Sequence, residues 1–465
     1  MKKLLLIGCF ASLAVSGCRK IEVDDNGTGG GGGTDENTIL SGKISADRTL
    51  KASNTYKLRG IVYLVDGATL TIEPGTRIEG EKSTRGALIV TRGTKLIANG
   101  TKDKPIVFTS DAASPAAGDW GGIVLLGRAR NNNSFNGAPG IGEIEGGVNN
   151  GEGHGLHGGA DDADNSGILK YVRIEYAGYA FLPDKELNSL TMGSVGHGTT
   201  IDNVQIAFAL DDAFEWFGGT VNASHLIAYK SLDDDFDTDN GYKGKVQFGI
   251  IMRDSSRADI SQSNGFESDN DANGSSVANL PQTSAIFSNI TVIGPRATTS
   301  NAGNSLFRRG AHIRRNSSIS IFNSIFMGWP TGIHIDAAAG RATDVNITDN
   351  NLFIQNTIIA GCAKPLDYSP NGTPTGMTLA ALTTWFNTPA FGNTIYADNG
   401  DVKLESPFNY SNPNFTPQTG SPALSGASFS NTKVASGFKP VTFRGAVGAA
   451  GSDDGEWWKG WTSFK

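Results

Sequence analysis

The sequence predicts an all-β fold, a parallel β-helix (a solenoid) with long loop insertions and a C-terminal cap. Short apolar stretches with period-2 alternation recur along the chain, as in VYLVDGATLTIE, and such alternation is typical of half-buried strands. Gly accounts for 61 of the 465 residues, which favours turns over helices. A strand motif also returns at a spacing that suits stacked coils. An antiparallel sandwich is the alternative, but Asn-Gly hairpin signals between adjacent strands are scarce.

The first 17 residues (1–17) have the pattern of a lipoprotein signal peptide and lie outside the predicted fold. Two lysines precede an apolar run over residues 4–15, which is too short to span a bilayer. The motif VSGC then ends at Cys18 and resembles the bacterial lipobox, in which cleavage before the cysteine is followed by its acylation, for instance with palmitate. The sequence therefore predicts lipid attachment at Cys18, with an ordinary secretory signal as the alternative. Only Cys362 then remains free, so no internal disulfide is expected.

Residues 18–38 form an acylated, Gly-rich tether in this prediction. Five consecutive glycines flanked by polar residues cannot bury enough surface to order themselves. Glu22, Asp24 and Asp25 follow the cysteine closely and resemble the acidic signal that sends lipoproteins of the Bacteroidota to the outer leaflet. We therefore expect a protein of the outer membrane, anchored in the lipid bilayer through acylated Cys18 and facing the cell exterior. A merely solvated tether is the alternative.

The body of the β-helix is expected over residues 39–365, and the last coils with a C-terminal cap over residues 366–465. From Leu40 to Gly127, apolar strands alternate with glycine turns. Further on, seven strand motifs are separated by 32, 21, 24, 41, 34 and 33 residues, whereas one coil needs about 20 or more. The longer coils should therefore carry loops. The motifs YVRI, NVQI, SHLI, FGII, NITV, NSIF and NTII begin at Tyr171, Asn203, Ser224, Phe248, Asn289, Asn323 and Asn356.

Several stretches are shared in pattern with a known family: GATLTIEPGTRI, GDWGGIVLLGRA, GILKYVRIEYAG, ALDDAFEWFGG, DDDFDTDNGYKG and RRGAHIRR. The chain resembles the uncharacterised parallel β-helix surface lipoproteins of the Bacteroidota over nearly its whole mature length. This resemblance implies a right-handed parallel β-helix on the cell surface, and it brings no established catalytic residues. The tail, with Trp457, Trp458 and Trp461, resembles the C-terminal end of the family and is expected to cap the last coil.

A Phe-acid step follows three of the strand motifs and predicts carboxylates stacked on one face. Glu215 and Asp237 occupy one phase of their coils, and Glu267 and Arg308 occupy a matching phase of longer coils. Like charges on adjacent rungs repel, so the column favours a bound cation or a pairing arginine. Trp216 adds an aromatic surface suited to a sugar ring, with gap filling in the core as the alternative. The predicted ligand-binding residues are Asp212, Glu215, Trp216, Asp237, Glu267 and Arg308.

Calcium is the expected cation, because hard cations prefer several oxygen ligands and the acidic turns supply them. The stretch DNDANG fits the first half of a D-x-D-x-N-G loop, but Leu280 stands at the twelfth position, which excludes an EF-hand. Asx turns are the alternative use of these side chains. A transition metal at His154 and His157 is a weaker hypothesis, because their Gly-rich loop does not pre-organise a site. The predicted metal ligands are Asp235, Asp237, Asp239, Asp269, Asp271 and Asn273.

The mild net charge of -7 argues against nucleic acid as a partner, since neutralising phosphates takes a concentrated basic face. The leading hypothesis is a non-enzymatic binding or accessory module whose partner is a glycan, a peptide or a TonB-dependent outer-membrane transporter. A calcium-dependent polysaccharide lyase or a glycoside hydrolase is the first alternative, because parallel β-helices often host such enzymes. A structural spacer of the envelope is the second. The sequence contains no clean catalytic triad, which favours binding over catalysis.

Overall fold

The computed structural model describes residues 38–182, 185–274, 280–298, 300 and 303–465. The expected signal peptide (1–17), the tether (18–38) except for its last residue, and Cys18 lie outside the described residues. Thr38–Lys465 forms one compact unit. Across these described ranges, no helix has the length and apolar character needed to cross a membrane.

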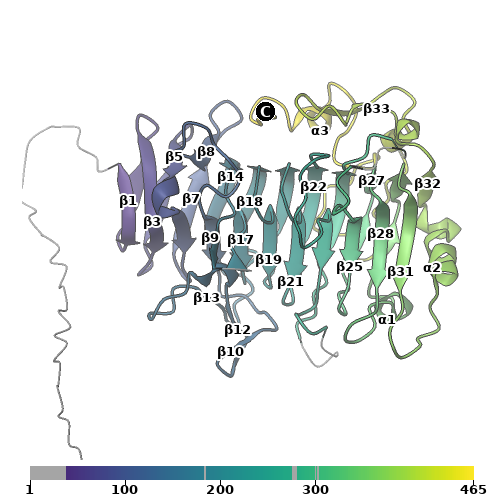
Figure 1. The fold of residues 1–465 in the computed structure, drawn as a ribbon, viewed down its shortest axis with the longest axis horizontal. Coiled ribbons are helices and arrows are strands. Elements are labelled where there is room, and N and C mark those ends of the chain that lie inside the picture. The colour runs from purple at the N-terminus through teal and green to yellow at the C-terminus, as the bar shows by residue number, and fades with distance from the viewer. Residues whose placement is uncertain (1–37, 183–184, 275–279, 299, 301–302) are drawn as a thin grey trace, which may run out of the picture. The chain divides into compact units, whose positions relative to one another are not determined.

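The compact unit is a parallel β-helix (Figure 1). One sheet of 26 strands winds through it, and neighbouring coils pair in parallel. The predicted all-β class and the stacking of successive coils are therefore confirmed. Antiparallel pairs form small sheets in the loops, between β10 (Ser134–Phe135) and β11 (Ala138–Pro139), β12 (Ile141–Glu143) and β13 (Leu156–Gly158), β15 (Ala180–Leu182) and β16 (Lys185–Glu186), and β33 (Leu404–Ser406) and β34 (Asn414–Pro417).

The coils contribute strands to two long stacks, the second of which is bent into two rows that meet at a corner. Both stacks begin in the N-terminal strands β1 (Ile39–Ile44), β2 (Arg48–Leu50), β3 (Thr55–Leu64) and β4 (Thr69–Ile72). The first, here named the site stack, contains β6 (Ala87–Val90), β9 (Gly122–Leu126), β17 (Leu190–Gly193), β19 (Phe214–Phe217), β21 (Phe236–Asp239), β23 (Phe266–Ser268), β25 (Arg309–Ile313), β28 (Thr331–Asp336) and β31 (Lys364–Ser369). The second contains β5 (Arg77–Gly80), β7 (Lys95–Asn99), β8 (Ile106–Ser110), β14 (Gly167–Glu175), β18 (Thr200–Ala207), β20 (Ala223–Tyr229), β22 (Lys245–Met252), β24 (Ile286–Ile293), β26 (Ser320–Phe322), β27 (Ile325–Met327), β29 (Ile354–Gln355), β30 (Ile358–Ala360) and β32 (Thr394–Tyr396).

Each coil of the second stack turns at a residue with left-handed backbone conformation. The φ angle is 53° at Asn203 and 55° at His225, for example. Asn tolerates this conformation better than most side chains, which explains why four of the seven predicted motifs begin with it. The predicted repeat is confirmed at six of its seven starting residues. The third coil turns at His225 and not at Ser224, because Leu226 pairs with Val204.

Apolar side chains fill the inside of the coils. Phe214, Phe236 and Phe266 are fully buried on successive rungs, and their rings meet edge to face with centroids 5.5 Å and 5.3 Å apart. Aromatic contacts of this geometry add to the stabilisation from burial. Successive strand residues point to opposite faces, so an inward Phe directs the next residue outward. The core register thus fixes the outward direction of the acid in each Phe-acid step.

The helices of the described residues are short, and the α-helices all come from the C-terminal part of the chain. α2 (Leu379–Phe386) begins after Thr378, whose hydroxyl accepts a hydrogen bond from the backbone N–H of Ala381. It buries Leu382 and Phe386 in the main core beside β31, at the end of the stack (Figure 1). The other α-helices are α1 (Val345–Thr348) and α3 (Asp453–Glu456), and the 3-10 helices are η1 (Lys82–Thr84), η2 (Glu145–Gly147), η3 (Pro389–Phe391), η4 (Asn399–Val402) and η5 (Pro422–Leu424).

The C-terminal tail runs back along the outside of the second stack. The ring of Trp457 lies 5.0 Å from that of His225, and the ring of Trp461 lies 5.7 Å from that of Tyr171. These partners belong to middle coils, so the expectation that the tryptophans cap the last coil is wrong. Apolar side chains on the outer face of the second stack need a cover, and the tail provides it.

Candidate functional site

Three carboxylates stack on the outer face of the site stack. The register pairs Glu215 of β19 with Asp237 of β21, and Asp237 with Glu267 of β23. Neighbouring strands of a sheet lie about 4.8 Å apart. The predicted vertical neighbourhood of these three side chains is confirmed, and we name them the carboxylate column. Their part in binding a ligand stays a prediction.

The carboxylate column continues with histidines and not with Arg308. Glu267 pairs with His312 of β25, and His312 pairs with His334 of β28. His312 lies 23 residues after the left-handed corner of its coil, whereas Glu267 lies 19 residues after the corner of the preceding coil. The expected place of Arg308 in the column is therefore wrong, because the connection before β25 is four residues longer. The sequence carried a signal for His312, since GAHI has strand alternation.

Further carboxylates crowd the carboxylate column at the turn before each strand. Two groups of three acids share Asp237, and within each group the ligand oxygens lie within 4.8 Å of one another. One group adds Asp212 and Glu215, and the other adds Asp234 and Glu267. The backbone N–H of Asp234 donates to Asp212 Oδ1 at 2.8 Å, which ties the two turns together. A third group at the same turns consists of Asp211, Asp212 and Asp233. We define the acidic cluster as Asp211, Asp212, Glu215, Asp233, Asp234 and Asp237.

Burial and mutual repulsion raise the pKa values of the acidic cluster. At Glu215 burial is the larger cause and the charge of Asp237 adds to it, so its pKa lies well above the usual range. The pKa of Asp212 is raised in the same way by burial and then by Asp211. Burial also raises the pKa of Asp233 to about 7. None of the six acids forms an ion pair with a side chain in the described part of the chain. The charge of Arg253 acts to lower the pKa values of Asp233 and Asp234, but burial and the neighbouring carboxylates outweigh it.

Buried polar atoms without a protein partner point to a ligand at the acidic cluster. Asn188 donates its Nδ2 to Glu215, while its Oδ1 has no hydrogen-bond partner among the described residues. The buried hydroxyl of Thr191, one rung before Glu215, and the buried Oδ1 of Asp237 also have no hydrogen-bond partner among the described residues. Leaving such an atom unpaired costs about 1–3 kcal/mol. The available ligand atoms of Asp212, Glu215 and Asp237 are oxygens, the kind that calcium prefers, so calcium stays the predicted cation.

Two predicted metal ligands need correction, because arginines already neutralise them. Asp235 is fully buried, and its Oδ2 lies 2.8 Å from Nε of the equally buried Arg253. Asp269 forms ion pairs with Arg314 at 2.8 Å and with Arg315 at 2.7 Å. Neither carboxylate belongs to the acidic cluster. Sequence spacing could not reveal the Asp235–Arg253 pair, because the two residues come from different coils.

The predicted loop site at Asp271 and Asn273 is a turn. Asp271 Oδ1 accepts a hydrogen bond from the backbone N–H of Asn273 at 3.0 Å, which is Asx-turn geometry. The alternative given for this stretch therefore describes it. Asp239, two residues beyond Asp237 on β21, points to the same outer face, and burial followed by the charge of Asp269 raises its pKa to about 8. Its predicted role as a metal ligand stays a prediction.

Trp216 belongs to the core and not to a ligand surface. Its side chain is 0% exposed, and its ring stacks on Phe214 at 5.9 Å and on Tyr242 at 5.3 Å. The expectation that it stacks against a sugar is therefore wrong. The physical reason is the alternation of strand side chains, because the outward direction of Glu215 turns its neighbour inward.

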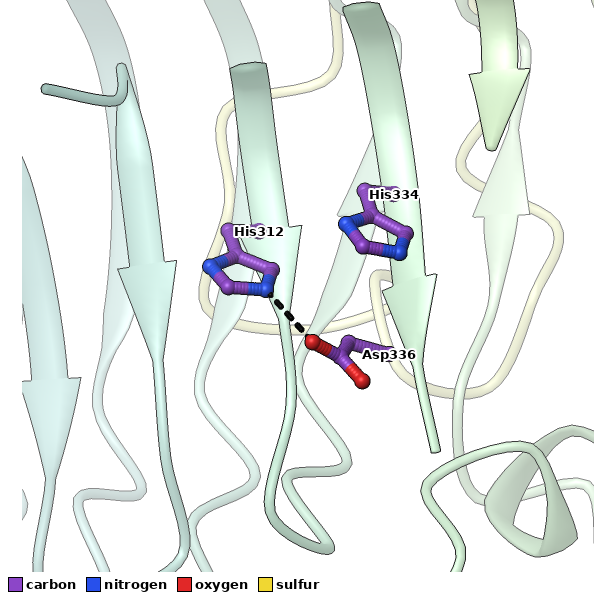
Figure 2. Close-up of side chains that lie close together, drawn as sticks. All are labelled: His312, His334 and Asp336. Carbon is purple, nitrogen blue, oxygen red and sulfur yellow. Dashed lines mark hydrogen bonds and ion pairs between the residues drawn. The ribbon is translucent and has the colours of Figure 1, made fainter. Parts of the chain in front are cut away.

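His312, His334 and Asp336 lie together beyond the carboxylate column (Figure 2). His312 Nε2 lies 3.0 Å from Asp336 Oδ2, and His312 Nδ1 lies 3.3 Å from Glu267 Oε1. The two imidazole rings are parallel, with an interplanar angle of 6° and centroids 5.0 Å apart. Parallel rings do not direct their in-plane lone pairs at one point. This geometry is that of a hydrogen-bonded network and not of a tetrahedral zinc site.

The hydrogen bonds of His334 fix its tautomer. Its Nδ1 accepts from Nε of Arg309 at 2.8 Å, so its Nε2 carries the proton and donates to Ser369 Oγ at 2.9 Å. Burial, together with the charges of His312 and Arg309, lowers the pKa of His334 to about 4. The ring is therefore neutral at pH 7 and holds the arginine in place.

Glu267 marks the end of the unneutralised acids. Burial acts to raise its pKa, but the hydrogen bond from His312 and the charge of Arg314 outweigh burial and lower it. Arg314 forms an ion pair with Glu267 as well as with Asp269. The site stack thus changes from acidic to basic at β25.

The predicted His-rich loop does not gather its histidines around one metal. His154 Nδ1 lies 3.1 Å from Asn150, and its ring lies 5.4 Å from that of Tyr63. His157 is fully buried, with its Nδ1 2.8 Å from Ser194 Oγ, and burial lowers its pKa to about 3. The two rings therefore serve packing and local hydrogen bonds.

Together, the fold and the site define a parallel β-helix protein that carries a row of charged side chains on the outside of one sheet. The chain belongs to the family of pectate-lyase-like β-helix domains, which it matches over residues 42–399. A solved structure of an alginate lyase from Paenibacillus sp. str. FPU-7 is similar at 12% sequence identity and a TM-score of 0.20, covering 66% of this chain and 93% of that chain. No curated protein matches the sequence.

Proposed function

We propose that this chain is a surface-exposed lipoprotein of the outer membrane whose β-helix binds a glycan through calcium held by the acidic cluster. The observation that carries this proposal is the crowding of six carboxyl groups, none of which forms an ion pair with a side chain in the described structure. Calcium relieves their repulsion and offers open coordination positions to sugar hydroxyls. The motif at Cys18 and the glycine tether support the anchor. A peptide or a TonB-dependent transporter remains the alternative partner of the same face.

Polysaccharide cleavage is the second candidate function. Membership of the pectate-lyase-like family favours it, and so do acids such as Asp233 whose pKa of about 7 suits a general acid. Within each group of three acids the nearest oxygens lie within 4.8 Å, closer than the about 6.5–9.5 Å between the two carboxyl groups of an inverting hydrolase. Elimination needs a free base, and His312 faces Glu267 and Asp336 with its two ring nitrogens. Binding without cleavage therefore accounts for more of the geometry.

The decisive experiment combines metal analysis with a glycan array. Purified protein is dialysed against calcium, washed, and analysed for bound metal, and it is then applied to the array in calcium or in chelator. We expect retained calcium and glycan signals that vanish in chelator and in Asp237→Asn. Asp103→Asn is the matched control, because Asp103 is exposed and lies outside the acidic cluster. A protein that holds no calcium and gives the same signals in chelator overturns the proposal, and release of shorter sugars promotes the second candidate.

A further inference from the structure

A cavity of about 490 Å³ opens beside the first residues of β25, β28 and β31. Its charged lining is mostly basic, with Arg296, Arg308, Arg309 and Lys364, and Thr331 lies on the rung between Arg309 and Lys364. The acid in the lining, Asp367, already pairs with Lys364 at 3.2 Å. The cavity lies on the same face as the acidic cluster but on the basic side of Glu267. It is a site that the calcium proposal does not use.

Two adjacent arginines of this cavity have no carboxylate partner within the described residues. Arg308 is exposed and forms neither an ion pair nor a side-chain hydrogen bond there. Arg309 is half-buried, and its one side-chain hydrogen bond in the described structure goes from Nε to His334. Its two terminal nitrogens are therefore unused. Two unpaired guanidinium groups side by side repel one another, and an anion between them removes that cost.

Arg309 is held ready for such an anion by the residues behind it. Ser369 accepts a hydrogen bond from His334 Nε2, and His334 Nδ1 in turn accepts one from Arg309 Nε. This chain fixes the plane of the guanidinium while leaving its outer edge to the cavity. A fixed fork loses less entropy on binding an oxyanion than a free side chain does. Polar side chains of Asn304, Ser305 and Thr331 complete the lining.

We propose that this cavity is an oxyanion site that binds a sulfate, phosphate or carboxylate group of an anionic ligand between Arg308 and Arg309. Oxyanions of this kind match the planar, multi-donor guanidinium group. The volume of about 490 Å³ is enough for a small ligand and is not restricted to a bare ion. The lining hydroxyl and amide groups suit the polar remainder of the ligand.

The test is isothermal titration calorimetry on the purified, chelator-treated protein with three probes: sodium sulfate, sodium phosphate and sodium glucuronate at constant ionic strength. We expect saturable binding of at least one probe to the wild type. Binding of sulfate or phosphate alone identifies an ester-type anion, and binding of glucuronate identifies a carboxylated ligand. Arg308→Gln and Arg309→Gln should each weaken the binding at least tenfold.

Arg77→Gln is the matched control, because it removes the same charge from an exposed arginine that pairs with Glu79 elsewhere on the helix. It should bind the probes as the wild type does. Arg308 is exposed, so its replacement leaves the fold intact even if Arg309→Gln does not. The proposal is overturned if none of the three probes binds saturably, or if Arg308→Gln binds them as tightly as the wild type. Chelator removes the calcium site from the measurement, so the two proposals succeed or fail separately.

Discussion

Replacing Asp237 with Asn should stabilise the calcium-free protein and abolish its response to calcium. Asp237 belongs to two of the three groups of acids, and a carboxylate oxygen of Asp237 lies within 4.8 Å of those of four other carboxyl groups. A pair of unit charges at that distance repels by about 3.5 kcal/mol at an effective dielectric constant near 20. Protonation of the cluster at neutral pH offsets part of this repulsion. We therefore expect the amide to raise the unfolding free energy of the chelated protein by about 1–3 kcal/mol at pH 8.

The expected changes in melting temperature follow from the size of the folded unit. The entropy of unfolding for Thr38–Lys465 is about 0.9 kcal/mol/K, so 1 kcal/mol shifts Tm by roughly 1 °C. Calcium at about 100 times its Kd adds about 2.7 kcal/mol, or roughly 3 °C, to the wild type. Differential scanning fluorimetry in chelator and in calcium measures both effects. The reasoning is refuted if Asp237→Asn melts below the wild type in chelator, or if it keeps the calcium shift.

Three further outcomes follow from the same contacts. The raised pKa of Asp233 (about 7) stabilises the chelated protein at low pH, and this contribution is lost as the pH rises from about 4 through 7. The Tm measured in chelator should therefore fall over that window. Calcium should restore the Tm at pH 8 but not at pH 5. Arg253→Met leaves Asp235 buried without its partner and should lower the free energy of unfolding, measured by denaturant titration, by about 3–5 kcal/mol. A decrease below about 1 kcal/mol contradicts a structural role for the pair. Trp216→Phe should lower Tm while leaving calcium and glycan binding at the wild-type level, and a selective loss of glycan binding returns Trp216 to the ligand surface.

The carboxylate column could be predicted from the sequence because it depends on local rules. A Phe that enters the core fixes the direction of the residue after it, and the coil repeat then brings Glu215, Asp237 and Glu267 to one face. The same alternation, applied one residue further, places Trp216 inside. The expectation for Trp216 was wrong because it followed from the residue type, an aromatic next to carboxylates. The strand alternation in the sequence already placed this side chain inside.

Arg308 illustrates what local rules cannot supply. Its expected place assumed equal coil lengths, and the loop before β25 is four residues longer than that of the preceding coil. Ion pairs between coils are equally hidden, because Asp269 and Arg314 meet through stacking and not through spacing. Position within a strand is local, whereas loop length and cross-coil pairing are set by tertiary contacts. The positions of the arginines around β25 therefore could not be predicted from the sequence and are known only from the structure.

The change of charge along the site stack makes a final prediction possible, on how far the two proposed sites influence one another. Asp237 on β21 and Arg309 on β25 are separated by two rungs, about 10 Å along the stack, and Arg309 stands three residues before His312, the residue in register with Asp237, so about 10 Å is the smallest separation. A divalent and a monovalent charge at that distance in water interact by about 0.8 kcal/mol, and a Debye length near 8 Å at physiological salt reduces this further. Calcium should therefore tighten oxyanion binding by less than about fourfold in calorimetry at 0.15 M salt. A much larger effect contradicts two independent sites and requires one ligand that touches calcium and Arg309 together.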